Sequence, residues 1–397
     1  MTKVHQSLSG NRTYDVIVIG VGSMGSSTCC FLAKNGYNVL GLEQFEIPHD
    51  KGAHAGQSRI IRKAYFEHSD YVPLLERAYE NWKALEAESG TTIYYKTGLL
   101  YSGQPDDPVI KGIKNSASLY QIQLECVDRP SISKSFPQFK IPTHFETWLE
   151  TDAGFVTPEK AVLLYTELAI KNGASIHTNE KVIEWKREGK GIKVITNKNN
   201  YTCSKLVITA GAWSGKMIPG FEKNIKVTRQ FIAWVKPKKW NEFSIGHFPC
   251  WLFADDEREY GVYYGFPILP VATFNGPIGL KVAHHYPAHE TDPDSVERNV
   301  LTEDEENIKY VLQKYFPDAI ESVLSTKTCL YANSPDENFI IDKLTGYEDH
   351  VVIACGFSGH GFKFVSVVGE ILADLAIGGM STQPIGFLSA SRFDGKG

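Results

Sequence analysis

The stretch that decides the fold is Tyr14-Asp-Val-Ile-Val-Ile-Gly-Val-Gly-Ser-Met-Gly25. Residues 14–19 form a short apolar run rich in β-branched side chains, which suits a strand buried on both faces. Residues 26–35 after the glycines predict a helix that Gly36 ends. Residues 38–42 predict a second strand, so the segment has the size of a strand–helix–strand unit.

The three glycines of Gly20-x-Gly22-x-x-Gly25 have separate roles in such a unit. The first permits a tight turn, the second lets the backbone approach a pyrophosphate, and the third lets the helix and strand pack closely. The helix N-terminus offers free N–H groups to phosphates. Glu43 ends the second strand, eighteen residues after Gly25, where its carboxylate can accept ribose hydroxyls. The predicted dinucleotide contacts of this unit are Gly20, Gly22, Ser23, Met24, Gly25 and Glu43.

The far end of the chain repeats the pattern of the beginning. Residues 351–355 predict a strand that ends in the glycine-rich segment 356–361, and an apolar-faced helix follows. Residues 206–210 predict another buried strand that runs into Gly211. Residues 226–290 are rich in aromatic residues, Gly and Pro, as expected of an antiparallel sheet. Further expected elements are one strand over 94–101, helices over 69–88, from 158 and over 304–316, and short strands between 174 and 203.

The unit at the start of the chain does not by itself decide between NAD and FAD. Two features favour FAD: the short strands that lead to Ala210 and Gly211 resemble the meander of glutathione-reductase-like proteins, and the C-terminal strand–glycine–helix returns to the same domain. We therefore predict a three-layer, glutathione-reductase-like α/β FAD-binding domain with an inserted α+β substrate domain built on an antiparallel sheet. The predicted boundaries are 1–90, 150–225 and 325–397 for the FAD-binding domain, and 91–149 and 226–324 for the substrate and catalytic domain.

Composition excludes several classes of protein. The 397 residues hold 41 Lys and Arg against 46 Asp and Glu, a net charge of −5, so no basic excess predicts nucleic-acid binding. The most apolar long stretch, 364–380, contains Glu370 and Asp374, which argues against a membrane span. Neither end carries a secretion or peroxisomal signal, and the seven cysteines contain no CxxC pair. We expect a cytoplasmic protein with reduced thiols and no metal site.

Six segments together point to one family: YDVIVIGVGSMG, HAGQSRIIRKAY, YYGFP, GLK, TCLYANSPDENFIID and GFSGHGFKF. The sequence resembles the monomeric sarcosine oxidase and N-methyltryptophan oxidase family of covalent flavoproteins over nearly its whole length. That resemblance implies FAD joined by a cysteine thioether to the flavin 8-methyl carbon, and the matching cysteine here is Cys329. Such a bond needs a thiolate, which a neighbouring cation favours.

The resemblance also assigns four cations. Arg62 and Lys363 match the pair that holds the substrate carboxylate, for which a guanidinium offers two parallel donors. Arg59 matches a basic residue near the flavin ring. Lys281 matches the lysine that activates oxygen, because a fixed positive charge stabilises the superoxide that the first electron transfer would form.

His285, Tyr331 and Tyr264 match residues of the substrate pocket. His285 and Tyr331 are therefore assigned to the reaction, with Lys281 and Arg59, and Tyr264 to substrate binding. The other cofactor contacts that we expect are Ser58, Arg59, Val182, Ala210, Gly211, Gly356, Gly359, Gly361, Phe362 and Lys363.

The chain also departs from the family pattern. Ala55 follows His54 where the family often has a second histidine, and Gln57-Ser58 replaces a more usual Asp-Thr. Segments 254–260 and 268–278 are longer than in typical members. We expect both segments to lie near the substrate side chain, so they bear on substrate identity more than on the type of reaction.

The expected activity is oxidation of a secondary, N-methyl amino acid such as sarcosine by a monomeric enzyme. The imine would be hydrolysed to an amino acid and formaldehyde, and O2 would be reduced to H2O2. Other interpretations stay open: an oxidase of a cyclic imino acid or of a larger N-alkyl amino acid such as N-methyltryptophan, an NAD-dependent dehydrogenase, and a flavin-binding protein without turnover. The retention of Arg62, Lys281 and Lys363 together argues against the last.

Overall fold

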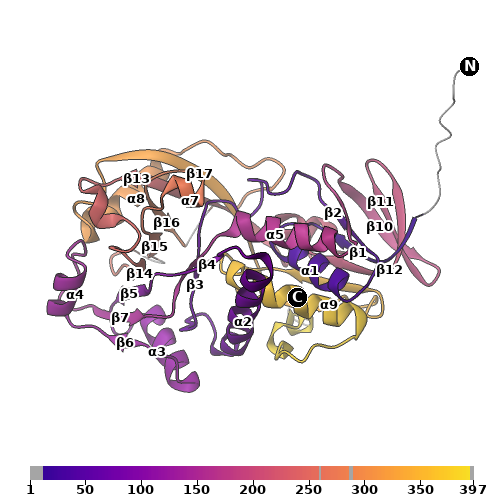
Figure 1. The fold of residues 1–397 in the computed structure, drawn as a ribbon, viewed down its shortest axis with the longest axis horizontal. Helices are drawn as coiled ribbons and strands as arrows, with labels where there is room; N and C mark the ends of the chain where they lie inside the picture. The colour runs from indigo at the N-terminus through magenta and orange to yellow at the C-terminus, as the bar shows by residue number, and fades with distance from the viewer. Residues whose placement is uncertain (1–11, 259–260, 286–288, 394–397) are drawn as a thin grey trace, which may run out of the picture.

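A computed structural model describes residues 12–258, 261–285 and 289–393. In Figure 1 two large sheets lie at opposite ends of the long axis of the molecule, with helices between them. The helices are α1 (Ser23–Lys34), α2 (Val72–Ser89), α3 (Pro108–Tyr120), α4 (Arg129–Ser135), α5 (Pro158–Lys171), α6 (Ser214–Met217), α7 (Val271–Phe274), α8 (Thr302–Tyr315) and α9 (Val365–Ile377).

The first sheet holds the N-terminal unit that the glycine pattern predicts. Its central strand β1 pairs in parallel with β2 on one side and with β12 on the other. The N-terminal half of β12 pairs with β11, while its C-terminal half pairs in parallel with β19, so the sheet forks there. The strands of this sheet are β1 (Arg12–Ile19), β2 (Val39–Leu42), β9 (Ser175–His177), β10 (Val182–Glu188), β11 (Gly191–Thr196), β12 (Asn200–Ile208), β18 (Ile340–Lys343) and β19 (Val351–Cys355).

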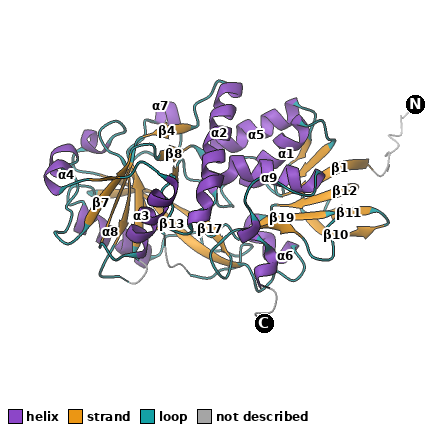
Figure 2. Cartoon of the chain, turned by 90° about the horizontal axis from the view of Figure 1, so that it is seen from below, coloured by secondary structure: helices purple, strands orange, loops and turns teal. Residues whose placement is uncertain are grey.

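Both faces of the parallel strands are buried, as their continuous apolar runs require. Helices α1, α2, α5 and α9 lie together on one side of β1, β12 and β19 (Figure 2), where Val16, Val18 and Val207 belong to the same core. On the opposite face Ile17 and Ile208 pack with side chains of the hairpin β10–β11. The parallel strands therefore lie between a helical layer and the hairpin, and the carboxyl ends of β1, β12 and β19 meet at one edge.

The second sheet is mixed and not purely antiparallel, because β14 runs parallel to β5. This pairing joins a strand from before residue 150 to one after residue 249, a long-range contact that local alternation does not predict. Its strands follow the order β17 (Ser322–Asn333), β13 (Lys226–Lys236), β16 (Leu280–His284), β15 (Val262–Phe266), β14 (Cys250–Ala254), β5 (Leu99–Gly103), β7 (Glu146–Glu150) and β6 (Glu125–Cys126).

One expectation about an individual strand was wrong. Residues 94–101 are not one strand: Gly98, at φ +73°, separates β4 (Tyr94–Lys96) from β5. β4 pairs with β8 (Gly154–Val156) and, through it, with β3 (Arg59–Ile61), in a small third sheet. β17 belongs to the second sheet, paired with β13, so the boundary expected at residue 325 falls inside a strand of that sheet.

Most helix positions agree with the sequence patterns, although their ends differ. α1 begins at Ser23, three residues earlier than expected, because the glycine turn itself forms the first helical turn. α5 begins at Pro158 after Thr157, as expected for proline in a first turn. Among the described residues, no helix is both long and apolar enough to cross a membrane, and no group of three or more potential metal ligands gathers.

Candidate active site

A cavity lies at the edge of the first sheet where β1, β12 and β19 end. Its lining runs from the glycine turn and the end of β2 to the segments after β12 and β19. A wall that is drawn from so many segments suits an extended ligand. Expected cofactor residues on its wall are Gly20, Gly22, Ser23, Met24, Glu43, Arg59, Val182, Ala210, Gly211, Gly356, Gly359, Gly361 and Phe362.

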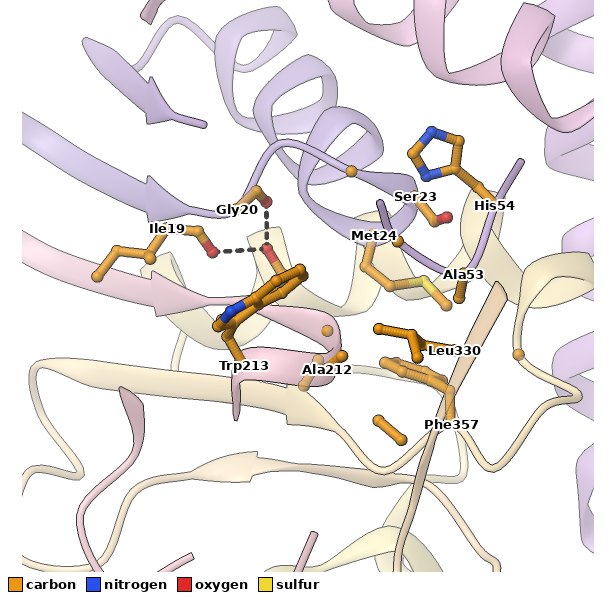
Figure 3. Close-up of a pocket in the computed structure, with 18 of the residues that line it drawn as sticks. Ile19, Gly20, Ser23, Met24, Ala53, His54, Ala212, Trp213, Leu330 and Phe357 are labelled. Atoms are coloured by element: carbon orange, nitrogen blue, oxygen red, sulfur yellow. Dashed lines mark hydrogen bonds between the residues drawn. The ribbon is translucent and has the colours of Figure 1, made fainter. Parts of the chain in front are cut away.

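The glycine turn at the cavity has the backbone geometry that the sequence predicts. Gly20 has φ +86°, a conformation that side chains disfavour. A Cβ at Gly25 would lie 1.8 Å from the carbonyl oxygen of Gly20, so only glycine lets the helix and strand approach this closely. A Cβ at Gly22 would meet only the His54 ring, at 3.9 Å, which leaves its side toward the cavity free for a ligand. Thr209 Oγ1 donates to the carbonyl oxygens of Ile19 at 3.1 Å and of Gly20 at 2.7 Å, the two hydrogen bonds that Figure 3 draws as dashed lines.

Glu43 stands at the end of β2 as expected. Its two carboxylate oxygens accept hydrogen bonds from the backbone N–H groups of Val21 and Phe45, each at 3.0 Å. Burial raises the pKa of Glu43 to about 7, although these N–H groups oppose the shift. The carboxylate is therefore fixed at the cavity wall, with lone pairs available to a hydroxyl donor.

Aromatic side chains that the sequence did not single out complete this end of the cavity. The rings of Phe45 and Trp213 lie 5.6 Å apart, edge to face, and both line the cavity. The Trp213 indole N–H donates to Asp294 at 2.8 Å. Asp294 also pairs with Lys216, so the segment between β16 and β17 lies against the first-sheet region here.

The residues present fit a dinucleotide such as FAD. His54 lines the cavity, is 3% exposed, and its Nε2 has no hydrogen-bond partner among the residues that the structure describes. Burial lowers its pKa to about 3, with His49 acting in the same direction, so the ring is neutral. A bound ligand would supply a partner to such a buried polar atom on a residue that lines the cavity.

Five of the predicted site residues share one face of the second sheet. In β13, β16 and β15, Trp234 pairs with Lys281, which in turn pairs with Phe266. Residues directly opposite in antiparallel strands project to the same side, and so do residues two apart in one strand. The side chains that share this face by register are Lys281, Tyr264, Cys329 and Tyr331, and His285 follows directly on β16.

Cys329 lies on this face but does not itself line either cavity. Its neighbours Leu330 and Tyr331 line the larger cavity, and Cys329 packs with Tyr331 and Trp234. Burial raises the pKa of the thiol, and Arg59 followed by Lys281 opposes that shift. Two of the predicted cations, Arg59 and Lys281, therefore act electrostatically on the predicted thiol.

A second, smaller cavity adjoins the first, since Arg59, Gly359 and Phe362 line both. Gly359, at φ +79°, allows this junction, because a Cβ there would lie 2.2 Å from the ring of Tyr331. The predicted residues that line the smaller cavity are Arg59, Arg62, Tyr264, His285 and Lys363. The structure thus gathers residues that are separated by up to 304 positions in the sequence.

Arg62 is held by a carboxylate that sequence reasoning missed. Its Nη2 lies 2.6 Å from both oxygens of Glu67, and its Nη1 donates to the carbonyl of Ala64 at 2.8 Å. Burial alone would raise the pKa of Glu67, but the charge of Arg62 outweighs it and the pKa falls to about 2. The available signal was that Arg62 and Glu67 lie five residues apart, but neither the helical nor the strand period brings residues at that spacing to the same face.

Lys363 approaches the same cavity from the turn that precedes α9. Its Nζ donates to the carbonyl of His360 at 2.7 Å and lies 3.5 Å from the hydroxyl of Tyr65. Burial lowers the pKa of Lys363 to about 7; Arg62 acts in the same direction and Glu67 opposes it. An anion bound in the cavity in addition to Glu67 would therefore raise the pKa of Lys363 and favour its charged form.

His285 and Tyr331 lie together across the junction of the two cavities. His285 Nδ1 is 3.4 Å from the Tyr331 hydroxyl. Burial lowers the pKa of His285 to about 3, so this imidazole is neutral near pH 7. His360, also on the smaller cavity wall and not predicted, bonds to Tyr65 at 2.5 Å and is likewise neutral, since burial lowers its pKa to about 4.

Lys281 lines neither cavity and is 1% exposed. Its Nζ donates to the carbonyls of Gly56 and Ser58, each at 2.6 Å, and to the Ser58 hydroxyl at 3.2 Å. Three acceptors match the three donors of an ammonium group. Ser58 therefore holds Lys281 and does not line the cofactor cavity, whereas it was expected to contact the cofactor.

The two longer segments do not lie where we expected. Residues 268–278 are absent from the described lining of the smaller cavity, and the carbonyl of Asn275 accepts a hydrogen bond from Gln57 at 2.6 Å. In segment 254–260, Asp255 accepts from Lys314 and Tyr315 of α8. Residues 259 and 260 lie outside the described residues. Asp255 thus contacts α8, and Asn275 contacts the loop that holds Gln57.

Known proteins resemble this chain in sequence or in fold. The model of the FAD-dependent oxidoreductase family matches residues 15–375. Monomeric sarcosine oxidase of Streptomyces avermitilis is 38% identical over 96% of this chain and 98% of its own length. N-methyl-L-tryptophan oxidase of Salmonella dublin is 32% identical over 96% and 99%. Among solved structures, the open form of NikD, an unusual amino acid oxidase, covers 95% of this chain and 97% of its own, with a TM-score of 0.83 at 23% identity, which supports the likeness of fold.

Proposed function

Because the chain belongs to the family of FAD-dependent oxidoreductases, we propose that it is a flavoprotein oxidase of N-methyl amino acids such as sarcosine. Two cavities support this proposal. One suits an extended dinucleotide, and the other, which shares Arg59 with it, places two buried cations, Arg62 and Lys363, beside each other. A small amino acid would fit both cavities if its carboxylate lay in the smaller cavity and its reacting group lay at the larger one.

In this proposal Arg62 and Lys363 bind the substrate carboxylate. Arg62 already holds a carboxylate in two-oxygen fashion, that of Glu67. A substrate carboxylate would replace Glu67 at the guanidinium and give Lys363 the anionic partner that opposes its low pKa. Fixing the acid group in this way orients the N-methyl group toward the larger cavity, and orientation is worth up to about 7–11 kcal/mol.

The substrate amine must be neutral to react, and the cavity favours that form. Arg59, Arg62 and Lys363 line the smaller cavity with one carboxylate, Glu67, so positive charge is in excess there, while His285 and His360 are neutral near pH 7. Neighbouring positive charge disfavours an ammonium ion and so lowers the pKa of a bound amine. The neutral His285 and the Tyr331 hydroxyl are placed to accept or donate a hydrogen bond at that amine.

Bound FAD would supply the two-electron acceptor that receives the hydride equivalent and passes the electrons to O2. The glycine turn, Glu43 and His54 would hold it, and the neutral His54 Nε2 would gain its missing partner. We further propose that Cys329 carries the flavin as a thioether and that Lys281 presents positive charge to O2. The coupling of Cys329 to both Arg59 and Lys281 supports this placement.

The region of the first sheet is then proposed as a three-layer, glutathione-reductase-like FAD-binding domain, and the second sheet as the core of the substrate domain. We place the junction near residue 334, after β17, in view of the pairing of that strand. The name of the relatives, monomeric sarcosine oxidase, supports a monomer.

Product analysis tests this function. Purified protein is given sarcosine, N-methyltryptophan or a cyclic imino acid, and H2O2 and formaldehyde are measured. We expect one formaldehyde per H2O2 from an N-methyl substrate. H2O2 without formaldehyde from the cyclic imino acid alone would favour that alternative. No H2O2 from any amine, with FAD bound, would contradict the proposal.

Acid precipitation tests the attachment separately. We expect a yellow pellet from the wild-type protein and, after Cys329→Ser, colour in the supernatant. Cys126→Ser, which changes an exposed cysteine, is the matched control and should leave the pellet yellow. A yellow pellet from the Cys329→Ser protein would remove this residue as the attachment site.

A further inference from the structure

The backbone loop that holds Lys281 is itself held by a carboxylate from a distant helix. Glu159, in the first turn of α5, accepts hydrogen bonds from the N–H groups of Gly56 at 2.6 Å and of Gln57 at 3.1 Å. The Lys281 ammonium binds the carbonyls of Gly56 and Ser58. The peptide unit between Gly56 and Gln57 therefore donates to a carboxylate at one end and accepts from an ammonium at the other.

This arrangement requires an unusual backbone at the loop. Gln57 has φ +71°, in the left-handed region that favours glycine, and Gly56 has φ +121°. Such a conformation costs free energy and persists only where the surroundings fix it. Glu159 fixes it from one side, while the side chain of Gln57 bonds to the Trp234 indole at 3.1 Å and to Asn275. The direction of the Gly56 carbonyl toward Lys281 depends on these contacts.

The charge of Lys281 needs support from its surroundings. Its titratable neighbours are Arg59 on β3, Glu159 on α5, Cys329 on β17 and Cys250 on β14. Burial lowers the pKa of Lys281 well below its ordinary value, Arg59 acts in the same direction, and Glu159 opposes both. Burial would raise the pKa of Glu159, but the N–H groups of Gln57 and Gly56 outweigh it and keep the group ionised.

We propose that Glu159 is a positioning residue for the oxygen half of the reaction, acting through the Gly56–Gln57 peptide to hold Lys281 in place and charged. O2 takes two electrons and two protons from the reduced flavin enzyme and leaves as H2O2. Negative charge first appears on oxygen, and a fixed ammonium stabilises it. A peptide polarised by a carboxylate at its N–H end presents a more negative carbonyl oxygen to that ammonium. This inference rests on the function proposed for Lys281.

The two half-reactions separate this inference from that function. The flavin of Glu159→Gln protein is reduced by sarcosine without oxygen and is then mixed with O2 in a stopped-flow instrument. We expect the rate constant of reoxidation to fall about tenfold or more, while the rate of anaerobic reduction and the FAD content stay within about twofold of wild type. Glu167→Gln is the matched control, because it removes the same charge from an exposed position on the same helix.

The charge of Lys281 provides a readout that does not depend on turnover. In protein labelled with 13C at the lysine Cε atoms, the signal lost in Lys281→Met identifies Lys281. We expect the wild-type signal to be that of an ammonium at pH 7 and its apparent pKa to fall in Glu159→Gln. Glu159→Asp, which keeps the charge but draws it back by one methylene, should show a smaller shift and a smaller loss of reoxidation rate.

Several outcomes would overturn the inference. Unchanged reoxidation in Glu159→Gln, or reduction slowed as much as reoxidation, would assign Glu159 a merely structural role or none. A neutral Lys281 in the wild-type protein at pH 7 would overturn it even if no variant folds. If sarcosine fails to reduce the wild-type flavin, the proposed function fails, and that result is seen before O2 is added.

Discussion

Arg62, beside the smaller cavity, is held by a carboxylate, whereas Lys281, on the second sheet, is held by main-chain carbonyls. The two cations are both buried, yet their partners differ in kind. Glu67 is a side chain that another carboxylate can replace. The Gly56 and Ser58 carbonyls belong to a loop that Glu159 fixes.

This difference matches what each cation is proposed to do. A cation that binds and releases an acid needs a partner that is anionic and exchangeable, so that the buried charge is never left alone. A cation that only supplies charge to a transient anion needs a fixed position, which neutral acceptors provide without cancelling its charge. A change at the substrate-binding cation should therefore leave the reaction with O2 unaffected, and a change at Lys281 should leave substrate binding unaffected.

The largest effect is expected from Arg62→Met. It removes the guanidinium that would bind the substrate carboxylate and leaves Glu67 buried without its partner. We expect kcat/KM for sarcosine to fall by about 10³-fold, the equivalent of roughly 4 kcal/mol. The loss should be far smaller with dimethylamine, which has no carboxylate. Arg77→Met, which removes an arginine paired with Glu370 outside both cavities, is the control and should leave kcat/KM unchanged.

Lys281→Met should act on the opposite side. We expect kcat/KM for O2 to fall by about 10²-fold, because the loss of one preorganised charge typically costs about 3 kcal/mol. The dissociation constant of a carboxylate inhibitor, measured by its effect on the flavin spectrum, should not change. Lys327→Met, which removes a neighbouring cation from β17, should have little effect on either quantity. An equal loss in the Lys327 variant would mean that general positive charge is enough.

Glu67, the partner of Arg62, should make the free energy of unfolding depend on pH. The pKa of Glu67 is lowered from 4.5 to about 2 in the folded protein. A lowered folded pKa adds stability above pH about 4.5 that is lost as the pH falls toward about 2, roughly 3 kcal/mol in total. Denaturant unfolding at a series of pH values should show this loss in wild type and less of it in Glu67→Gln. The same pH dependence in both proteins would mean that other carboxyl groups cause it.

The smallest effect is expected from Ser58→Ala. It removes only the hydroxyl contact to Lys281 at 3.2 Å and leaves both carbonyls in place. One hydrogen bond contributes about 0.5–1.5 kcal/mol, so we expect kcat/KM for O2 to fall by about two- to tenfold. A loss as large as that of Lys281→Met would show that the hydroxyl, and not the backbone, fixes the ammonium.

Local patterns in the sequence predicted the first sheet well. The glycine turn, the strand before it and Glu43 lie within 30 residues, and short-range sterics dictate their geometry. The family resemblance then identified Arg62, Lys363, Tyr264 and His285, which line one cavity. The break at Gly98 was missed, because both halves of 94–101 suit a strand and only the tertiary pairing separates them.

Two carboxylates, Glu67 and Glu159, could not be found in this way. Glu159 lies 102 residues from Gln57, and an acidic residue in the first turn of a helix has an ordinary explanation in the helix dipole. Glu67 lies in a loop that no period describes. Likewise, the sequence of β17 has an ordinary strand pattern, and only its pairing with β13 assigns it to the second sheet. Partners of buried charges are set by tertiary structure, which pattern reasoning does not reach.

The central claim is that the two sides of the site serve separate half-reactions. It is tested most directly by stopped-flow measurement of flavin reduction by sarcosine and of reoxidation by O2 in Arg62→Met and Lys281→Met. We predict that Arg62→Met slows reduction and leaves reoxidation unchanged, and that Lys281→Met does the reverse. Both variants slowing the same half-reaction, or each slowing both equally, would contradict the claim.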